Sequence, residues 1–438
     1  MLEITTLGSF VAALVICLVS GKSILYALIF AFVIFCLYAL YKGFSVGQVG
    51  LACKRSVAKI STIVIVMLLI GALTASWRAS GTIAYLVSYA ADVISPSWCL
   101  VGTFLLNAAL SVLIGTSFGT AATMGVVTMS LSVAMGVSPF WAGGAVLAGA
   151  YVGDRCSPVS TSAQLVAAVT QTKLYKNIKF MLLTGLMPFL LACIVYFIVG
   201  EWQQTTESFL DLKGLFQREY VLSAWTLMPA IVLLGLVSLK ADIKVSISAS
   251  IAAAAATAIF VQSFDTIRVV ESLFEGFKAV DPEVSKLMSG GGVISMVQVC
   301  FIILISCTFA GIFELTGMLG RLEKAIERLS RHTGVFFTIA ATALTTAMLA
   351  CNQMLAVILT EQLCRQIQPD KQKMAISLEN TAIVIAPLVP WSIAGAVPIA
   401  TIGAPQSSIL AALYLILLPL WGILSEKAMR KTYPFFRD

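Results

Sequence analysis

The sequence is poor in charged residues and has almost no histidine, and these scarcities exclude large classes of protein. Only 11% of its 438 residues are charged, and His332 is its single histidine. A soluble domain carries about 25% charged residues. With 59% hydrophobic residues and a mean hydropathy of +0.97, the chain is predicted to be an all-α polytopic membrane protein without room for a soluble catalytic domain.

Motifs for metal, redox and hydrolytic chemistry are missing as well. The ten cysteines are scattered, and no CxxC pair or cluster of histidine and cysteine occurs, so neither a zinc site nor a disulfide framework is predicted. No HExxH sequence, paired-aspartate peptidase signature or nucleophile elbow occurs either. We therefore expect a protein that is not an enzyme and that holds no cofactor. His332 stands among loop arginines and is interpreted as a solvated loop residue.

Positive charge is concentrated between the apolar runs. The net charge is +7, and cytoplasmic loops collect Lys and Arg, so no nucleic-acid partner is needed to explain it. The loop after the first two spans has no acidic residue and is predicted to be cytoplasmic, as is the N-terminus two spans before it. A basic tail after the last span, Ser407–Leu424, places the C-terminus on the same side. The basic residues are Lys42, Lys54, Arg55 and Lys59 in the loop, and Lys427, Arg430 and Lys431 in the tail.

These observations predict a multi-pass protein integral to the cell membrane. Its expected partners are the lipid bilayer and a small ion or solute, and the sequence leaves open whether two copies form a homodimer. The first apolar run begins near Leu7 without a basic n-region or a small-residue cleavage site. We interpret it as a retained span and not as a signal peptide.

The stretch Gly149–Ser162 interrupts an apolar run with an acid, a base and a proline. Pro158 cannot continue the helical hydrogen-bond ladder, and a broken helix in lipid is tolerated only where it is buried in protein or lines a cavity. Asp154 and Arg155 are ionisable groups at this depth, which makes them functional-site candidates. Adjacent residues on a helix do not face each other, so a simple Asp154–Arg155 pair is not expected unless the helix is unwound.

Three further interruptions occur, one in the first half and two in the second, and the four form two pairs. Gly115–Thr120 resembles Cys351–Gln353, and Cys156–Val159 resembles Ile385–Leu388, at an offset of about 230 residues. The basic loop of the first half has a net acidic counterpart in the second, as opposite insertion requires. We predict two inverted-topology repeats with broken helices and re-entrant hairpins. Residues 1–200 form the first repeat, residues 201–220 an external linker, and residues 221–438 the second repeat.

Candidate site residues gather at these interruptions. Asp154 and Glu379 are the expected cation or proton ligands, since carboxylate oxygens suit Na⁺; the alternative for Glu379 is a helix end at the cytoplasmic surface. Arg155 and Arg78 are candidates for anion binding or gating, with snorkelling to an interface as the alternative. Hydroxyl and amide groups could bind the ion or simply hydrogen-bond across helices. These are Thr116, Ser117, Thr120, Ser157, Ser160, Thr161, Asn352, Asn380 and Thr381.

At these residues the chain resembles the NhaC-type Na⁺/H⁺ antiporters. The resemblance rests on GALTASWRASGT at Gly71–Thr82, GTSFGTAAT at Gly115–Thr123 and AGAYVGDRCSPVS at Ala148–Ser160. The second half adds Leu378–Glu379 and APLVPW at Ala386–Trp391. The resemblance implies a secondary transporter of the ion transporter superfamily, which exchanges Na⁺ for H⁺ by alternating access.

The chain departs from the family pattern at two positions. The family places an acid three residues after the first proline, where this chain has Thr161, and another after the second-half glutamate, where it has Asn380. Asp154 and Glu379 would then have to supply the titratable ligands alone. A relative that transports an amino acid or an organic anion, coupled to Na⁺ or H⁺, is the alternative function.

Overall fold

The protein is described here by a computed structural model. It describes residues 2–20, 23–59, 61–91, 95–203, 212–239, 241–317, 326, 329, 330, 333–350 and 352–432. Within these ranges the chain is helical and forms no strand, and one isolated bridge joins Phe277 and Gly290. The all-α prediction is confirmed.

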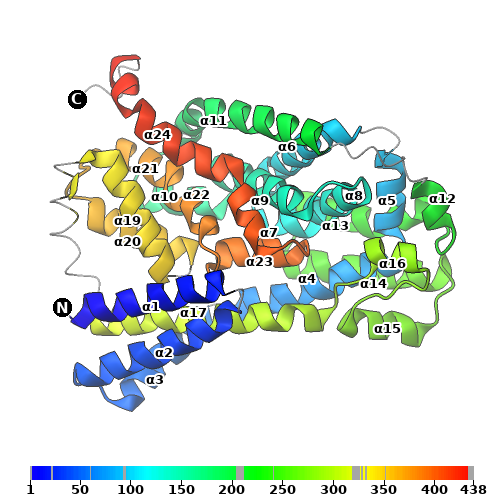
Figure 1. Ribbon diagram of the computed structural model, residues 1–438, viewed down its shortest axis with the longest axis horizontal. Helices are drawn as coiled ribbons and strands as arrows, with labels where there is room; N and C mark the ends of the chain where they lie inside the picture. The colour runs from blue at the N-terminus through cyan, green and yellow to red at the C-terminus, as the bar shows by residue number, and fades with distance from the viewer. Residues whose placement is uncertain are drawn as a thin grey trace.

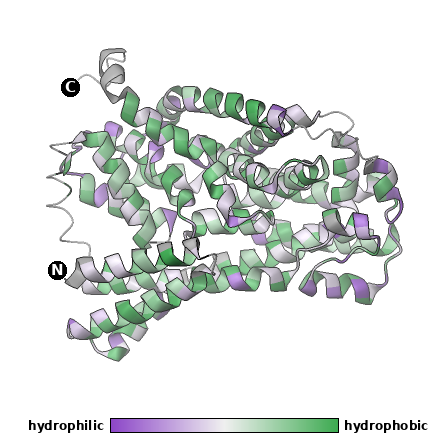
Figure 2. Cartoon of the chain, in the orientation of Figure 1, coloured by the Kyte–Doolittle hydropathy of each residue, from purple (hydrophilic) through white to green (hydrophobic). Residues whose placement is uncertain are grey.

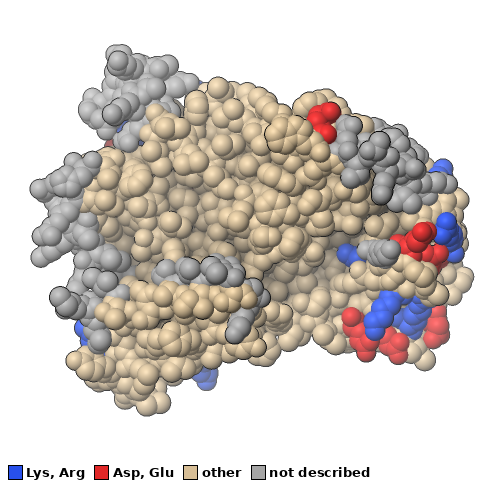
Figure 3. Space-filling view, in the orientation of Figure 1, with Lys and Arg blue, Asp and Glu red and all other residues tan. Residues whose placement is uncertain are grey.

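Most helices run along the long axis of the molecule (Figure 1). Five of the described helices are long and apolar enough to cross a membrane, or seven if each of two bent pairs counts as one span. Apolar residues cover most of the ribbon (Figure 2). Acidic and basic side chains gather at the end that carries α12, α15 and α16, and the wide face between the two ends carries almost none (Figure 3). An uncharged face of this kind suits contact with lipid. The start of α1 and the end of α24 lie at the same end (Figure 1).

The first half contains two interruptions at the predicted places. Helix α6 ends at Ile114 because Gly115 adopts a left-handed φ of 76°, a conformation that glycine tolerates. The chain then turns back through α7, a π-helical segment and α8. Helix α9 ends at Cys156, and α10 begins at Thr161. The helices of this half are α1 (Leu2–Val19), α2 (Ile24–Tyr41), α3 (Val46–Lys59), α4 (Ser61–Ala79), α5 (Thr82–Ala91), α6 (Pro96–Ile114), α7 (Ser117–Thr120), the π-helix Ala121–Gly125, α8 (Val126–Ala134), α9 (Pro139–Cys156), α10 (Thr161–Thr170) and α11 (Leu174–Trp202).

The second half has interruptions at the matching places. Helices α19 and α20 meet in a turn before Gln353, and the segment from α21 to α23 is bent by 56° across the Pro387–Pro390 region. Its helices are α12 (Leu212–Gln217), the 3-10 helix Ala224–Leu227, α13 (Met228–Ser238), α14 (Ile243–Phe260), α15 (Thr266–Glu275), α16 (Pro282–Met288), α17 (Val293–Thr316), α19 (Val335–Ala350), α20 (Gln353–Cys364), α21 (Lys371–Asn380), α22 (Ala382–Ile385), the 3-10 helix Ala386–Leu388, α23 (Ile393–Thr401), the 3-10 helix Gln406–Ala411 and α24 (Leu413–Thr432).

Several segments expected to be loops contain helices. The basic loop after α2 is α3, which packs against α17 where Gly311 leaves room: a Cβ on Gly311 would lie 2.5 Å from Ser56 Oγ. The loop before α17 contains α15 and α16. The predicted linker 201–220 begins in the last turn of α11 and contains α12, and its residues 204–211 lie outside the described residues. The basic loop around His332 lies largely outside them too.

Glycines allow the two helices that carry the first interruption to approach closely. A Cβ on Gly153 of α9 would lie 2.0 Å from the carbonyl carbon of Ser111 on α6, and one on Gly149 would lie 2.5 Å from the carbonyl oxygen of Phe104. Small residues are the usual means of close helix packing in membranes. This contact fixes the position of the α9 terminus in the protein interior.

Candidate functional site

The first interruption buries an acid and a base at the end of α9. Ser157 is extended (φ −82°, ψ 137°) and ends the helix. Ser160 caps α10 by accepting hydrogen bonds from the backbone N–H groups of Ser162 and Ala163, at 3.1 and 3.2 Å, and its hydroxyl donates to the backbone carbonyl of Asp154. These bonds satisfy backbone groups that the break leaves without helical partners.

The carboxylate of Asp154 is buried and hydrogen-bonded by neutral donors from two other elements. Its Oδ2 accepts from Ser162 Oγ at 3.0 Å and from Gln353 Nε2 at 3.1 Å. The same amide group of Gln353 contacts the carbonyl oxygen of Ile383 on α22 at 3.4 Å. Gln353 therefore connects the acid of the first interruption to the broken helix of the second half.

A helix start and a tyrosine complete the surroundings of Asp154. The backbone N–H of Ser117, where the helix through α7 and α8 begins, lies next to this carboxylate. The positive end of a helix dipole favours negative charge there. Tyr151, one turn earlier on α9, donates a 2.8 Å hydrogen bond to the carbonyl oxygen of Ala394 on α23. Segments from both halves thus surround one buried acid.

Arg155 points to a different set of partners than its neighbour Asp154. Its Nη2 donates to Asn380 Oδ1 at 2.5 Å and to the carbonyl oxygen of Met181 at 3.0 Å, and also contacts Thr184 Oγ1 at 3.1 Å. Its Nη1 donates to the hydroxyl of Tyr414 at 2.9 Å. The guanidinium is fully buried. The expectation that Asp154 and Arg155 form no simple pair is in keeping with these contacts.

Glu379 is a second buried acid at this site, and no described group donates a hydrogen bond to it. It stands one residue before the end of α21 and has a side chain with no exposed surface, and neither carboxyl oxygen has a hydrogen-bond partner. Arg155 and Asp154 are its electrostatic neighbours. Burying an ionised carboxylate without hydrogen-bond donors costs much free energy. We therefore infer that Glu379 needs a bound proton or a nearby cation. Glu379 is therefore buried, in contrast to the alternative interpretation that placed it in a helix end at the cytoplasmic surface.

The structure does not bring every candidate to this place. The Thr161 side chain, at the start of α10, is exposed. Arg78 donates at 2.7 Å to the carbonyl oxygen of Ser289, in the loop before α17. Other polar groups bond to nearby backbone: Ser157 to the Val112 carbonyl, Thr120 to that of Thr116, Thr381 to that of Ser377, Thr116 to the Gly119 N–H, and Asn352 to the N–H groups of Met354 and Leu355.

The sequence analysis gave no site role to Thr184 and Tyr414, which hold Arg155. Gln353 and Ser162, which lie within the predicted interruptions, bond Asp154 directly. Thr184 and Tyr414 are isolated polar groups in long apolar helices, and that isolation is the signal in the sequence.

The donor set suits a hard monovalent cation better than a transition metal. Among the described residues there is no group of three or more histidine, cysteine or acidic side chains. Asp154 is surrounded by hydroxyl and amide groups, and Glu379 has two oxygens without donors. Oxygen ligands of this kind favour Na⁺ over soft metals.

Comparison with known proteins identifies relatives over most of the chain. The model of the Na⁺/H⁺ antiporter family matches residues 2–165 and 149–423. An uncharacterized Na⁺/H⁺ antiporter of Haemophilus influenzae is 28% identical over 377 residues, 82% of this chain and 80% of the relative. The Na⁺/H⁺ antiporter NhaC of Alkalihalophilus pseudofirmus is 27% identical over 372 residues, again 82% and 80%. A malate-2H⁺/Na⁺-lactate antiporter of Bacillus subtilis is 25% identical over 340 residues, 75% and 73%.

Proposed function

The chain belongs to the Na⁺/H⁺ antiporter family and is a secondary antiporter, and we propose that Asp154 is the group for which its Na⁺ and H⁺ compete. Exchange of two cations through one carrier requires a negative group that binds either ion but not both together. A buried carboxylate is such a group, because burial destabilises the bare anion and therefore favours the binding of either Na⁺ or H⁺.

The observation that carries this proposal is the position of Asp154 at the end of a broken helix. Its carboxylate meets a hydroxyl from α10, an amide from α20 and the start of the helix through α7. All of these partners are neutral and do not compensate the charge of the carboxylate, which is therefore available to bind a cation. Broken helices that meet in this way build the ion sites of known secondary transporters.

Glu379 is proposed as the second titratable ligand. Its two oxygens have no donors, and it lies within electrostatic range of both Asp154 and Arg155. A proton on Glu379 removes the cost of burying this charge, and a cation close to both acids does the same. Arg155 supplies a fixed positive charge beside them, so that fewer mobile cations are needed to neutralise the site.

Two contacts between the halves are proposed to change during alternating access. Gln353 bridges Asp154 and the carbonyl oxygen of Ile383, and Tyr151 bonds the carbonyl oxygen of Ala394. Gln353 links the two broken helices through α20, and Tyr151 links them directly. Opening the site to one side of the membrane requires these segments to separate or slide.

We also propose the inverted repeat and the orientation. Residues 1–200 and 221–438 are the two repeats and residues 201–220 the external linker, with both termini in the cytoplasm. Support comes from the matching series of a helical hairpin followed by a broken helix: α6 to α8 then α9 and α10 in one half, and α19 and α20 then α21 to α23 in the other. The termini of the described chain share one end of the molecule (Figure 1).

Transport in everted membrane vesicles tests the role of Asp154. Added Na⁺ should dissipate a pH gradient in vesicles with the parent protein, and Asp154→Asn should abolish this response. Glu271→Gln is the matched control, because Glu271 is an exposed acid on α15 outside the site. A parent-like response of Asp154→Asn at equal expression would remove Asp154 from the mechanism.

Exchange of an organic anion is the second candidate function. The fully buried guanidinium of Arg155 and the similarity to a malate-2H⁺/Na⁺-lactate antiporter favour it. Both terminal nitrogens of Arg155 are already bonded to protein groups, which argues for the ion exchanger first. Thermal-shift measurements with amino acids and small carboxylates, with and without Na⁺, distinguish the two functions, since stabilisation by a solute is expected only for the second.

A further inference from the structure

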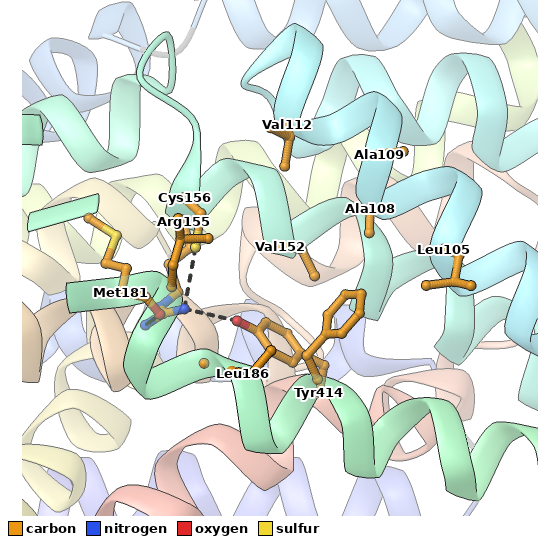
Figure 4. Close-up of a pocket in the computed structure, with 13 residues that line it drawn as sticks. Leu105, Ala108, Ala109, Val112, Val152, Arg155, Cys156, Met181, Leu186 and Tyr414 are labelled. Carbon is orange, nitrogen blue, oxygen red and sulfur yellow. Dashed lines mark hydrogen bonds between the residues drawn. The ribbon is translucent and has the colours of Figure 1, made fainter. Parts of the chain in front are cut away.

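A cavity of about 500 Å³ lies between α6, α9, α11 and α24, beside the ion site. Its walls are apolar, and the side chains that form them include Leu105 and Val112 on α6 and Leu182 and Leu186 on α11. Figure 4 shows Arg155, Cys156 and Tyr414 at the polar end of the cavity, with the hydrogen bond from Arg155 to Tyr414. The size is that of a pocket for a small organic molecule.

The mouth of this cavity opens toward lipid. Leu182 and Leu186 are 59% and 56% exposed, and Leu105 and Val112 are each 40% exposed. They lie on α6 and α11, which both qualify as membrane spans. Surface exposed on such spans faces hydrocarbon. A ligand that enters here therefore comes from the bilayer and brings an apolar chain.

Two hydrogen-bond donors at the inner end of the cavity have no acceptor among the described residues, although both terminal nitrogens of Arg155 are bonded. Arg155 is fully buried, and its Nε–H has no partner. The hydroxyl of Tyr414 accepts from Arg155 Nη1, which leaves its own proton free to donate. Among the described residues no carboxylate forms a salt bridge with Arg155. Gly185 brings α11 close to this pair, since a Cβ there would lie 2.7 Å from Arg155 Nη1 and 2.9 Å from the Tyr414 hydroxyl.

We propose that this cavity binds a single-chain aliphatic carboxylate from the bilayer, with its alkyl chain between α6 and α11 and its carboxylate at the Nε–H of Arg155 and the hydroxyl of Tyr414. The apolar walls solvate the chain, and the carboxylate meets a guanidinium and a hydroxyl, the donors that bind it most strongly. A bound ligand fills the space between α11, α6 and α9 and hinders their relative movement. Its carboxylate also neutralises part of the positive charge of Arg155. We therefore expect it to slow the exchange of ions.

The size of the cavity selects a single-chain carboxylate over a phospholipid. A volume of about 500 Å³ is that of a pocket for a small ligand, and a lipid with two acyl chains exceeds it. A phospholipid could therefore insert only one acyl chain, whereas a single-chain carboxylate fits with its headgroup beside Arg155.

Photo-crosslinking of the full-length protein in phosphatidylcholine nanodiscs tests the proposal. The probe is a fatty acid with a diazirine in its chain, and the labelled peptides are found by mass spectrometry. Saturable labelling is expected on residues 105–112 of α6 and 182–189 of α11. Dodecanoate should displace the probe at concentrations about tenfold lower than its methyl ester or dodecylamine do, and phosphatidylcholine alone should not displace it.

Two substitutions separate filling of the cavity from a general change of the surface. Ala109→Phe adds a ring to an exposed residue that lines the cavity and should abolish saturable labelling. Leu113→Phe changes a 76% exposed residue of the same helix that does not line it, and labelling should persist. Equal loss in both variants, or unsaturable labelling, overturns the site.

The headgroup assignment has its own test. Tyr414→Phe and Arg155→Gln should each reduce the preference for dodecanoate over its methyl ester while the chain still labels the cavity walls. A preference that persists in both variants, or competition by the ester equal to that of the acid in the parent protein, overturns the assignment of the carboxylate to Arg155. Parent-like ion exchange at saturating dodecanoate overturns the expected inhibition.

Discussion

Arg155 donates a 2.5 Å hydrogen bond from Nη2 to the side-chain oxygen of Asn380, 225 positions further along the chain. The bond joins the end of α9 to the end of α21, so each broken helix ends against a residue of the other. The amide stands where the related antiporters are expected to have an acid. In this chain it accepts from a buried guanidinium without adding a third negative charge.

Loss of this acceptor should destabilise the protein. Asn380→Ala leaves Arg155 Nη2 with Met181 and Thr184 as partners, and a hydrogen bond to a charged group contributes about 1.5–3 kcal/mol. We expect a lower unfolding temperature in tryptophan-fluorescence melts of the purified protein. Asn380→Asp keeps an oxygen acceptor and should unfold at a temperature closer to that of the parent. A lower unfolding temperature for Asn380→Asp than for Asn380→Ala would contradict this role.

Replacing Glu379 should change the coupling to protons more than the fold. Glu379→Gln keeps the shape of the side chain and removes a buried carboxyl group whose oxygens have no donors. We expect a folded protein in which Na⁺-driven proton movement falls by at least about tenfold and depends less on pH. The assay is dissipation of the pH gradient in everted vesicles between pH 6 and 9. An unchanged pH profile would show that Glu379 carries no proton in the exchange.

Gln353 should set the affinity of the Asp154 site. Gln353→Ala removes one of the two side-chain hydrogen bonds to the carboxylate and the link to α22. A charge-assisted bond is worth about 1.5–3 kcal/mol, so the apparent affinity for Na⁺ should change by about tenfold or more. Gln298→Ala is the control, since that exposed amide contacts Ser23 at the surface and lies outside the site. Equal effects of the two substitutions would argue against a specific role.

Close packing at Gly153 should not tolerate a side chain. A Cβ at this position would lie 2.0 Å from the carbonyl carbon of Ser111 and 2.2 Å from the backbone nitrogen of Val112. Because both contacts are backbone, α9 and α6 must separate, at a cost on the order of 3 kcal/mol. Gly153→Ala should therefore lower both expression and the unfolding temperature. Gly102→Ala, which meets nothing within 4 Å on α6, should leave both at least as high as in the parent.

The acidic residue that caps α16 should make that helix sensitive to acid. The backbone N–H groups of Val284 and Glu283 donate to Asp281 and hold the pKa of its carboxyl group below the ordinary value. The stabilisation is therefore complete above about pH 4, the usual pKa of aspartate, and is lost as the pH falls through the lowered pKa. Hydrogen exchange of α16 should accelerate in that range. Asp281→Asn should remove the acid dependence, whereas Asp265→Asn should not, because Asp265 caps α15 without a side-chain hydrogen bond.

Much of the fold followed from the sequence because membrane insertion imposes simple rules. Long apolar runs gave the helices, and glycine or proline within them gave the interruptions near Gly115, Cys156, Asn352 and Pro387. Loops were harder to predict: α3, α15 and α16 are short helices in polar segments. Their stability depends on packing against neighbours such as α17, and local sequence does not record that contact.

The sequence by itself determined that this protein is helical, that it belongs in a membrane, and that Asp154, Arg155 and Glu379 are ionisable candidates beside broken helices. Each of these follows from local composition, since charge and proline are costly in lipid wherever the chain ends up. Only the tertiary structure decided which groups meet: Gln353 with Asp154, and Asn380 and Tyr414 with Arg155. Those pairs are distant in the chain, and the contact between helices that selects them depends on the packing of whole surfaces.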